Sequence, residues 1–163
     1  MIINKLFLCL ALANLSNTDF KMKPNSLKTA CQYSEKLIIQ SEKQKVSPFL
    51  MASLIWVESR FEKKAISNKK ACGLTQVLAK YSKYSCKSLQ KPSISIEEGV
   101  RAFTFWYEHK KNIKKALECY NSGYYCNSPS YSKQILTKTK LLKTEYKKIQ
   151  LNYDYLWRKF GYE

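Results

Sequence analysis

The sequence is organised around one uncharged run and the acid that ends it: Ser47-Pro48-Phe49-Leu50-Met51-Ala52-Ser53-Leu54-Ile55-Trp56-Val57-Glu58-Ser59-Arg60-Phe61. Ser47 is a favourable N-cap residue and Pro48 suits the first helical position, so a helix is predicted to begin here. The residues that follow Pro48, up to Val57, carry no charge, and only Ser53 is polar. A helix that is apolar on every face is predicted to be buried in the core.

Glu58 is the first charged residue of this helix and is expected at its C-terminal end. Burial disfavours an ionised carboxyl, and the negative end of the helix dipole acts in the same direction. Both effects raise the pKa of the carboxyl and keep it protonated near neutral pH, as a general acid requires. The alternative is an acid that reaches the surface where the helix ends and pairs with Arg60.

Composition indicates one all-α domain with an anionic partner. The 163 residues are 45% hydrophobic and 13% aromatic, with only four glycines and four prolines. A chain of this length and composition forms a core, and many Lys, Leu and Ala favour helix. The net charge of +17 favours nucleic acid, an anionic membrane face or a bacterial envelope polymer as partner. The charge is spread along the chain and no nucleic-acid-binding motif is present, so nucleic acid is not the expected partner.

Met1 to Ser16 resembles a secretory signal peptide. Lys5 supplies the positive start, an apolar run follows, and Ala11-Leu12-Ala13 has a small-x-small cleavage pattern. The alternative is a buried N-terminal helix. No other apolar run is long enough to span a membrane.

The six cysteines are compatible with disulfides in an exported chain. Signal cleavage would remove Cys9 and leave five. The pairs Cys72/Cys86 and Cys119/Cys126 each bracket a short, turn-rich loop and can be bridged. The alternative is buried free thiols in a reducing cell. No CxxC motif occurs and His109 is the only histidine, so neither a zinc site nor another metal or cofactor is expected.

The chain on either side of the central helix also shows helical patterns. A scaffold helix is predicted from Lys28 to Ile39, and a polar segment joins it to the central helix. Ser95 and Glu98 have the spacing of a capping box, which predicts a helix from Ile96 to about Lys110. A further apolar stripe predicts a helix from Ile113 to Tyr120, which ends at residues that tolerate left-handed geometry.

A long basic helix with an apolar seam is predicted from Tyr131 to Phe160, with a break expected near Thr137-Lys138-Thr139. Its seam residues recur every seven positions, as in a coiled coil, and we expect them to pack across the domain. The alternative role is docking to a partner helix or to an anionic envelope surface. The seam consists of Ile135, Leu142, Ile149 and Leu156, interleaved with Thr139, Tyr146, Tyr153 and Phe160.

Four blocks that follow one another in the chain resemble the catalytic signature of soluble lytic transglycosylases, the lysozyme-like SLT family. The resemblance covers roughly residues 48–135, and both the order and the spacing of the blocks agree. The blocks are Glu58-Ser59-Arg60-Phe61 with Ala65-Ile66-Ser67, Gly73-Leu74-Thr75-Gln76, Ser95-Ile96-Glu97-Glu98-Gly99 with Phe103, and Tyr120-Asn121-Ser122-Gly123 with Tyr131 after it.

The resemblance implies a lysozyme-like fold and cleavage of the β-1,4 bond between N-acetylmuramic acid and N-acetylglucosamine in peptidoglycan. It implies one catalytic acid, Glu58, that acts first as acid and then as base to close a 1,6-anhydro ring, with Tyr120 orienting it. Residues implied to contact the substrate are Ser59, Ser67, Gly73, Gln76, Tyr120 and Asn121. As isolated residues, Ser67 and Gln76 have a simpler alternative role in caps and turns.

Three positions depart from the family pattern. Lys70 replaces a glycine, Thr75 replaces a methionine that lies along the cleft in relatives, and Ser95 replaces an asparagine. Thr75 is therefore expected to alter contact with the sugar rings, and Ser95 to change only a helix start.

Three other functions remain open at this point. A hydrolytic, goose-type lysozyme would need a second carboxylate, with Glu97 or Glu98 as the nearby candidates. A non-catalytic wall-binding or assembly protein, or a basic nucleic-acid binder, would need no acid at residue 58.

The expected organisation is a signal peptide over 1–16, a helix and linker over 17–46, a catalytic domain over 47–135 and a basic helical extension over 136–163. The expected protein is an exported monomer in the periplasm or cell envelope, or associated with a virion. Secretion, conjugation or phage assemblies and housekeeping wall turnover are the systems considered.

Overall fold

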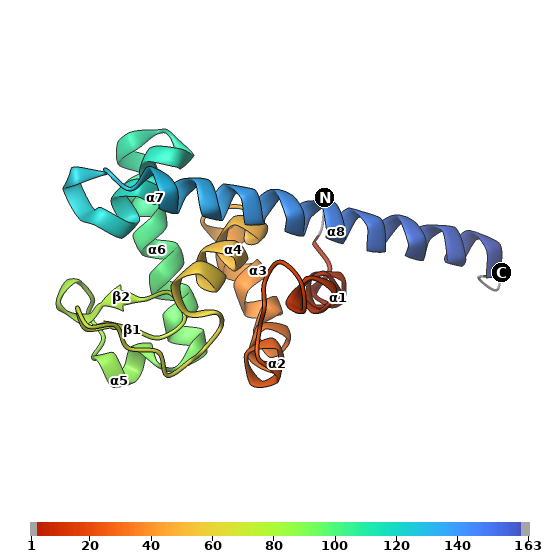
Figure 1. Ribbon diagram of the computed structural model, residues 1–163, viewed down its shortest axis with the longest axis horizontal. Helices are drawn as coiled ribbons and strands as arrows, with labels where there is room; N and C mark the ends of the chain where they lie inside the picture. Colours follow the sequence, from red (N-terminus) through yellow and green to blue (C-terminus); the bar gives the residue numbers. More distant parts are fainter. Residues whose placement is uncertain (1–2, 161–163) are drawn as a thin grey trace.

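A computed structural model describes residues 3–160, apart from the side chain of Phe160. These residues form a helical body from which one long helix projects (Figure 1), so the predicted all-α class with a long C-terminal helix is confirmed. None of the helices in this part of the chain is long and apolar enough to cross a membrane. The elements, in order, are α1 (Lys5–Ser16), α2 (Pro24–Gln32), α3 (Ser34–Lys43), α4 (Pro48–Ser59), β1 (Ala71–Cys72), β2 (Val77–Leu78), η1 (Ala79–Tyr81), α5 (Cys86–Leu89), α6 (Pro92–Lys110), α7 (Ile113–Ser122), η2 (Gly123–Tyr125) and α8 (Pro129–Phe160).

Helix α4 is the central element, as its sequence predicts. It begins at Pro48, and every residue from Pro48 to Trp56 is buried. Ser47 precedes it in extended conformation, although its side chain makes no capping hydrogen bond. The helix ends where Arg60 turns into the left-handed conformation, with α3 and α8 packed against its sides. The burial of its apolar faces therefore fixes the place of Glu58, in its last turn.

The N-terminal segment forms a helix that is part of the core. In α1, Leu8, Ala11 and Leu12 are fully buried, and the helix packs against α2, α3 and α8. A disulfide that the sequence did not predict, Cys9–Cys31, joins it to α2. The structure thus has the buried N-terminal helix that was the alternative to a signal peptide, and cleavage of residues 1–16 stays a prediction.

The single helix predicted from Lys28 to Ile39 is wrong, because two helices meet at Tyr33. Helix α2 packs against α1 and ends at Gln32, next to the disulfide-bonded Cys31, whereas α3 packs mainly against α4 and α6. The Ser34 hydroxyl donates to the carbonyl of Cys31 at 2.9 Å, at the junction itself. The two halves of the apolar stripe are thus buried against different neighbours, and the chain turns between them.

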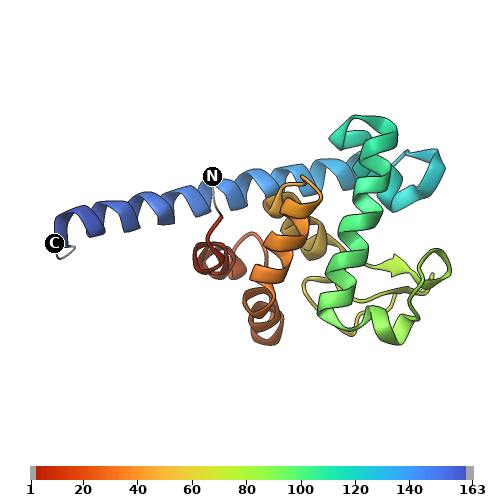
Figure 2. The same cartoon turned by 180° about the vertical axis from the view of Figure 1, so that it is seen from behind.

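Helix α8 runs without a break, so the predicted interruption near Thr137-Lys138-Thr139 is wrong. The seam is buried against α1, α4 and α7 from Ile135 through Tyr146, where the Tyr146 ring contacts both Phe7 and Phe49. Beyond residue 149 the helix leaves the body (Figures 1 and 2), and seam residues Tyr153 and Leu156 are exposed. The seam packs across the domain from Ile135 to Ile149, and the Tyr153 ring still contacts that of Phe7. The side chain of the last seam member, Phe160, lies outside the described residues.

Two disulfides predicted from loop spacing are present, Cys72–Cys86 and Cys119–Cys126. The first ties a small hairpin, which the sequence did not predict, to α5. In this hairpin β1 and β2 pair antiparallel, with Cys72 opposite Val77. The second closes a short loop between α7 and α8.

Candidate active site

Glu58 lies in the last turn of α4, facing the first turn of α8. The hydroxyl of Tyr131 donates a hydrogen bond to its Oε1. Burial raises the pKa of the Glu58 carboxyl to about 7, although the hydrogen bond from Tyr131 acts in the opposite direction. Near neutral pH this carboxyl therefore exists in both protonation states, which suits a group that must give and then take a proton.

Tyr120 and Tyr131 bring two phenols to this carboxyl from α7 and α8. Burial raises the pKa of each phenol well above its usual range, and the charge of Glu58 adds to the effect. Both hydroxyls thus stay protonated and act as donors. The family resemblance implied that Tyr120 would orient Glu58, but Tyr120 donates instead to the carbonyl of Thr75 at 2.8 Å. The hydrogen-bond partner of Glu58 is Tyr131, which the sequence had matched only as a following tyrosine.

The segment Gly73–Gln76 is held beside Glu58 by bonds to its backbone. The Ser59 hydroxyl donates to the carbonyl of Leu74 at 2.7 Å, and Tyr120 holds the next carbonyl. Gly73 adopts a left-handed φ of 75°, and an added Cβ would stand 1.9 Å from the carbonyl oxygen of Leu89. Ser59, Gly73 and Tyr120 therefore build the wall of the site.

Three predicted contact residues use their polar atoms within the fold. Ser67 Oγ accepts from the backbone of Ala71 at 3.1 Å and closes a turn. The Gln76 amide donates to the carbonyls of Ala65 and Gly73 at 3.1 and 2.9 Å. These are the turn roles that were the alternative for Ser67 and Gln76. Asn121 is exposed and its amide donates to Ser128 Oγ at 2.8 Å.

Two departures from the family pattern, Thr75 and Ser95, contact each other in the core. The Thr75 hydroxyl donates to the carbonyl of Ser95 at 2.8 Å, and the Thr75 backbone donates to Ser95 Oγ at 3.1 Å. Thr75 is fully buried, so its side chain does not lie along the surface as the methionine of relatives does. An altered contact with the sugar rings stays a prediction. The predicted capping box is also wrong, because α6 begins at Pro92 and Ser95 lies inside it.

The other carboxylates near this region are held by cations. Glu97 is 3.9 Å from Lys36 Nζ and is half-exposed. Glu98 is buried, and its hydrogen bonds with Arg101 and Ser82 outweigh the effect of burial, so its pKa is lowered. A hydrogen bond from Lys115 lowers the pKa of Glu118. The pKa of Glu58 is thus raised, whereas the pKa values of Glu98 and Glu118 are lowered.

A surface pocket lies at the opposite end of α4. Its lining includes Ser47 and Leu50 from the start of the helix, with Phe103 and Ile113 from α6 and α7. The length of α4 separates this pocket from Glu58, so it belongs to a different part of the surface.

A comparison with protein-family models identifies the family to which this region is similar. The model of the transglycosylase SLT domain matches residues 35–144, from α3 into the first half of α8. The matched region contains Glu58, Tyr120 and Tyr131 and leaves out α1, α2 and the projecting end of α8. No curated protein matches the chain.

Proposed function

The chain belongs to the transglycosylase SLT family, and from that premise we propose that it cleaves the β-1,4 bond between N-acetylmuramic acid and N-acetylglucosamine with formation of a 1,6-anhydro ring. Members of this family are lytic transglycosylases that act on peptidoglycan. The observation that supports this reaction is the carboxyl of Glu58, which has a pKa of about 7 and accepts a hydrogen bond from Tyr131.

In the first step, protonated Glu58 gives its proton to the glycosidic oxygen as the bond from that oxygen to C1 of the muramic acid breaks. The bonding electrons leave with the oxygen, and the positive charge that develops at C1 is opposed by the carboxylate that remains. Tyr131 keeps the carboxyl oriented throughout because its own phenol does not ionise.

In the second step, the Glu58 carboxylate removes the proton from the 6-hydroxyl of the same sugar as this oxygen bonds to C1. The 1,6-anhydro ring closes, and Glu58 regains its proton for the next cycle. No water is consumed, so one carboxyl performs both steps.

A hydrolytic lysozyme on the same fold is the second candidate, and it needs another carboxylate to position water. Glu98 is paired with Arg101 and Ser82, and Glu97 lies beside Lys36. These contacts leave neither acid poised to activate a water at Glu58, which supports the single-acid scheme.

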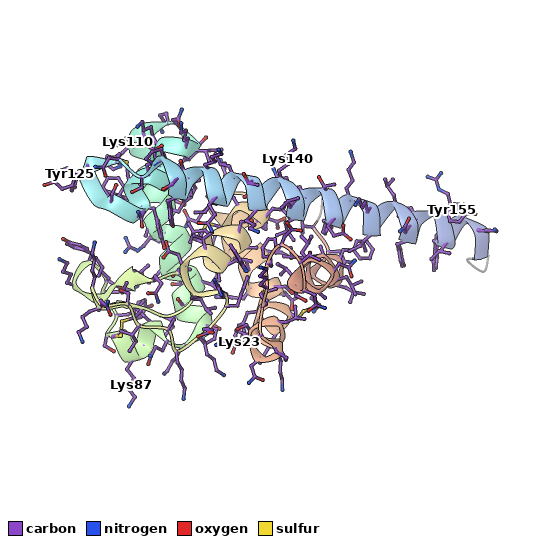
Figure 3. The ribbon with its side chains drawn as sticks, viewed as in Figure 1. Lys23, Lys87, Lys110, Tyr125, Lys140 and Tyr155 are labelled. Atoms are coloured by element: carbon purple, nitrogen blue, oxygen red, sulfur yellow. A yellow bond between two sulfur atoms is a disulfide. The ribbon has the colours of Figure 1, made fainter. Side chains whose placement is uncertain are left out.

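The charge of the protein supports an anionic wall polymer as substrate. Lysines project from the body and from α8, among them Lys23, Lys87, Lys110 and Lys140 (Figure 3). Exposed charges of one sign attract an anionic polymer, and salt screens that attraction. Binding to peptidoglycan is therefore expected to weaken as ionic strength rises.

We further propose that the protein works as a monomer outside the cytoplasm, in the periplasm or envelope or on a virion. Three disulfides support an oxidising compartment. A secretion, conjugation or phage assembly would give such an enzyme access to the wall. Recovery of the expressed chain in the cytoplasmic fraction with its cysteines reduced would contradict export.

The proposal is tested by mass spectrometry of the muropeptides that the purified chain releases from peptidoglycan. Products lighter by one water than hydrolytic ones are expected, and Glu58→Gln is expected to release none. Glu97→Gln, the matched control, should leave both product type and rate unchanged. Hydrolysed products, together with loss of activity in Glu97→Gln or Glu98→Gln, would instead establish the lysozyme.

A further inference from the structure

The loop between α7 and α8 exposes two neighbouring tyrosines. Tyr124 is 82% exposed and Tyr125 86%, the two highest values among the exposed large hydrophobic side chains of the described residues. Both lie in η2, and Tyr125 projects from the end of the body opposite the free end of α8 (Figure 3). Exposed aromatic side chains are enriched where proteins bind ligands, because each offers a large, rigid contact surface.

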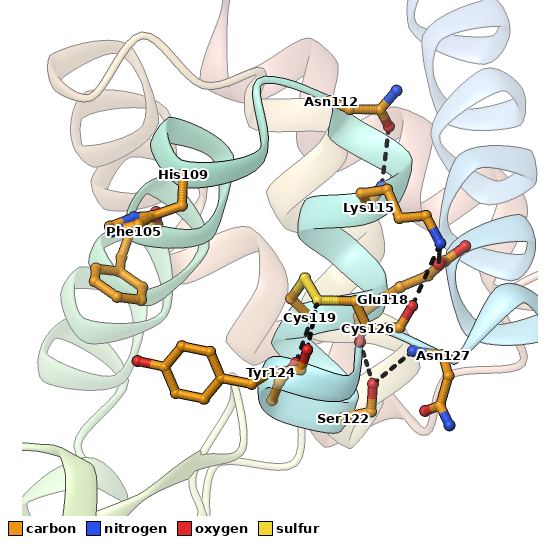
Figure 4. Close-up of a disulfide and its surroundings, with 11 residues drawn as sticks. Phe105, His109, Asn112, Lys115, Glu118, Cys119, Ser122, Tyr124, Cys126 and Asn127 are labelled. Carbon is orange, nitrogen blue, oxygen red and sulfur yellow. Dashed lines mark hydrogen bonds and ion pairs between the residues drawn. A yellow bond between two sulfur atoms is a disulfide. The ribbon is translucent and has the colours of Figure 1, made fainter.

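One disulfide and several hydrogen bonds hold this loop in one shape (Figure 4). The disulfide Cys119–Cys126 closes it, with the two Cα atoms 4.0 Å apart. Ser122 Oγ donates to the carbonyl of Glu118 at 2.8 Å and accepts from the backbone of Asn127 at 3.1 Å. The two tyrosines are thus presented by a backbone that loses little freedom when a ligand binds.

The Tyr124 ring extends from the loop towards α6 (Figure 4). Its centroid is 5.1 Å from that of Trp106, and the Trp106 centroid is 5.1 Å from that of Phe105. Phe105, itself 39% exposed, also contacts His109 at 4.2 Å. The aromatic platform, defined as Phe105, Trp106, Tyr124 and Tyr125, therefore combines rings from α6 and η2.

The platform continues from the residues that surround Glu58. Tyr124 follows Tyr120 by four positions, and Phe105 lies one helical turn beyond Arg101 on α6. Tyr120 donates to the carbonyl of Thr75 at 2.8 Å, in the segment beside Glu58, and α6 and α7 pack against each other. A polymer bound at Glu58 can therefore reach the platform by extending along α6 and α7.

We propose that the platform binds a pyranose ring of the glycan strand at some distance from the bond that is cleaved. The face of a pyranose carries several C–H groups, which are attracted to the negative face of an aromatic ring. Its hydroxyl groups lie around the edge and remain in water, so exposed tyrosines suit this ligand. The inference rests on the proposed function, because it takes the glycan strand as the ligand that binds at Glu58.

The experiment measures binding of N-acetylglucosamine oligomers, from the dimer to the hexamer, to the full chain with Glu58→Gln, which prevents turnover. Adding Tyr124→Ala and Tyr125→Ala together should weaken binding of the hexamer about tenfold and leave the dimer unaffected. Tyr124→Phe with Tyr125→Phe, which keeps both rings, should restore binding.

Tyr155→Ala is the matched control, because Tyr155 is also exposed but lies on the projecting end of α8 (Figure 3). It should leave hexamer binding unchanged. Equal hexamer affinity with and without the two platform tyrosines would overturn the proposal. So would a Glu58→Gln chain that binds no oligomer while the unaltered chain still cleaves peptidoglycan, and in that case the proposed function would stand. Loss of hexamer binding in the double alanine variant, with no cleavage by the unaltered chain, would instead support the platform and refute the proposed function.

Discussion

The hydroxyl of Tyr131 donates a hydrogen bond to Oε1 of Glu58 across a sequence separation of 73 residues. The acid comes from the buried end of α4 and its donor from the first turn of α8. A donor stabilises the ionised carboxylate, whereas burial destabilises it. Burial has the larger effect and raises the pKa of Glu58 to about 7. The pair thus sets both the orientation and the protonation of the proposed catalytic group.

Tyr131→Phe is predicted to lower activity on peptidoglycan about ten- to hundredfold, because the freed carboxyl loses its orientation towards the glycosidic oxygen. It also removes a bond that favours the ionised form, so the pKa of Glu58 should rise further. The pH at which activity is half lost on the alkaline side should therefore move upward. Rates of muropeptide release measured across pH for both proteins test this.

Tyr120→Phe is the matched control, since it removes a buried phenol that donates to Thr75 instead of Glu58. It should reduce stability or rate without the characteristic shift of the pH profile. An identical shift in both variants would refute a specific role for Tyr131.

The unaltered chain is predicted to lose kcat/KM as pH rises through about 7, because the first step needs protonated Glu58. Glu98 cannot produce this decline, since its pKa is lowered. The measurement is the initial rate on soluble glycan strands at constant ionic strength, which avoids changes in screening. A rate that stays constant from pH 6 to 9 would contradict Glu58 as the acid.

Glu58→Gln is predicted to stabilise the folded protein at alkaline pH while abolishing activity. The pKa of Glu58 is about 7 in the folded chain and 4.5 in the unfolded chain. Between these two pH values the folded chain therefore holds a proton on Glu58 that the unfolded chain has released. Stability of the unaltered chain therefore falls as pH rises through this window. At a pH above both pKa values, the free energy of unfolding is lower by about 3 kcal/mol.

Urea unfolding of both proteins across pH tests this prediction. The free energies of unfolding should converge below about pH 4.5, where the carboxyl is protonated in both states, and diverge as pH rises. Equal stabilities at pH 8 would indicate that the carboxyl is not destabilised by burial.

Local sequence patterns predicted the elements whose cause is local. The uncharged run before Glu58 located α4, because every face of that helix is apolar and has to be buried. The short loops between cysteines predicted two disulfides. The same reasoning failed at Ser95, where the spacing to Glu98 suggested a cap. The actual signal was Pro92, which suits the first position of a helix, and the Ser95 hydroxyl is needed by Thr75.

Contacts between distant parts of the chain were beyond such patterns. The hydrogen bond from Tyr131 to Glu58 depends on how α8 crosses α4, and helical periodicity does not specify a crossing. The disulfide Cys9–Cys31 likewise depends on α1 packing against α2. The split at Tyr33 was missed because a continuous apolar stripe does not reveal that its halves face different neighbours.

Leu142→Ala and Leu156→Ala are predicted to differ sharply in stability although both residues belong to the same seam. Leu142 is fully buried, so its truncation should cost about 2–5 kcal/mol through lost burial and a cavity. Leu156 is 52% exposed on the projecting end of α8, and its truncation should change stability by less than about 0.5 kcal/mol. Thermal unfolding of the two variants measures the difference, and a comparable loss in both would mean that the projecting end is packed in solution.

Gly73→Ala and Gly123→Ala separate steric overlap from backbone strain. Both glycines have left-handed φ values, 75° and 64°, so alanine costs about 1 kcal/mol or more in backbone strain at either position. At Gly73 the new Cβ would also overlap the carbonyl oxygen of Leu89, whereas nothing lies within 4 Å at Gly123.

Gly73→Ala should therefore lose several kcal/mol of unfolding free energy and much of its activity, because the segment beside Glu58 must move. Gly123→Ala should lose only the unfolding free energy that corresponds to the backbone strain. Equal losses of unfolding free energy in the two variants would show that the Gly73 segment yields without cost, and would remove it from the wall of the site.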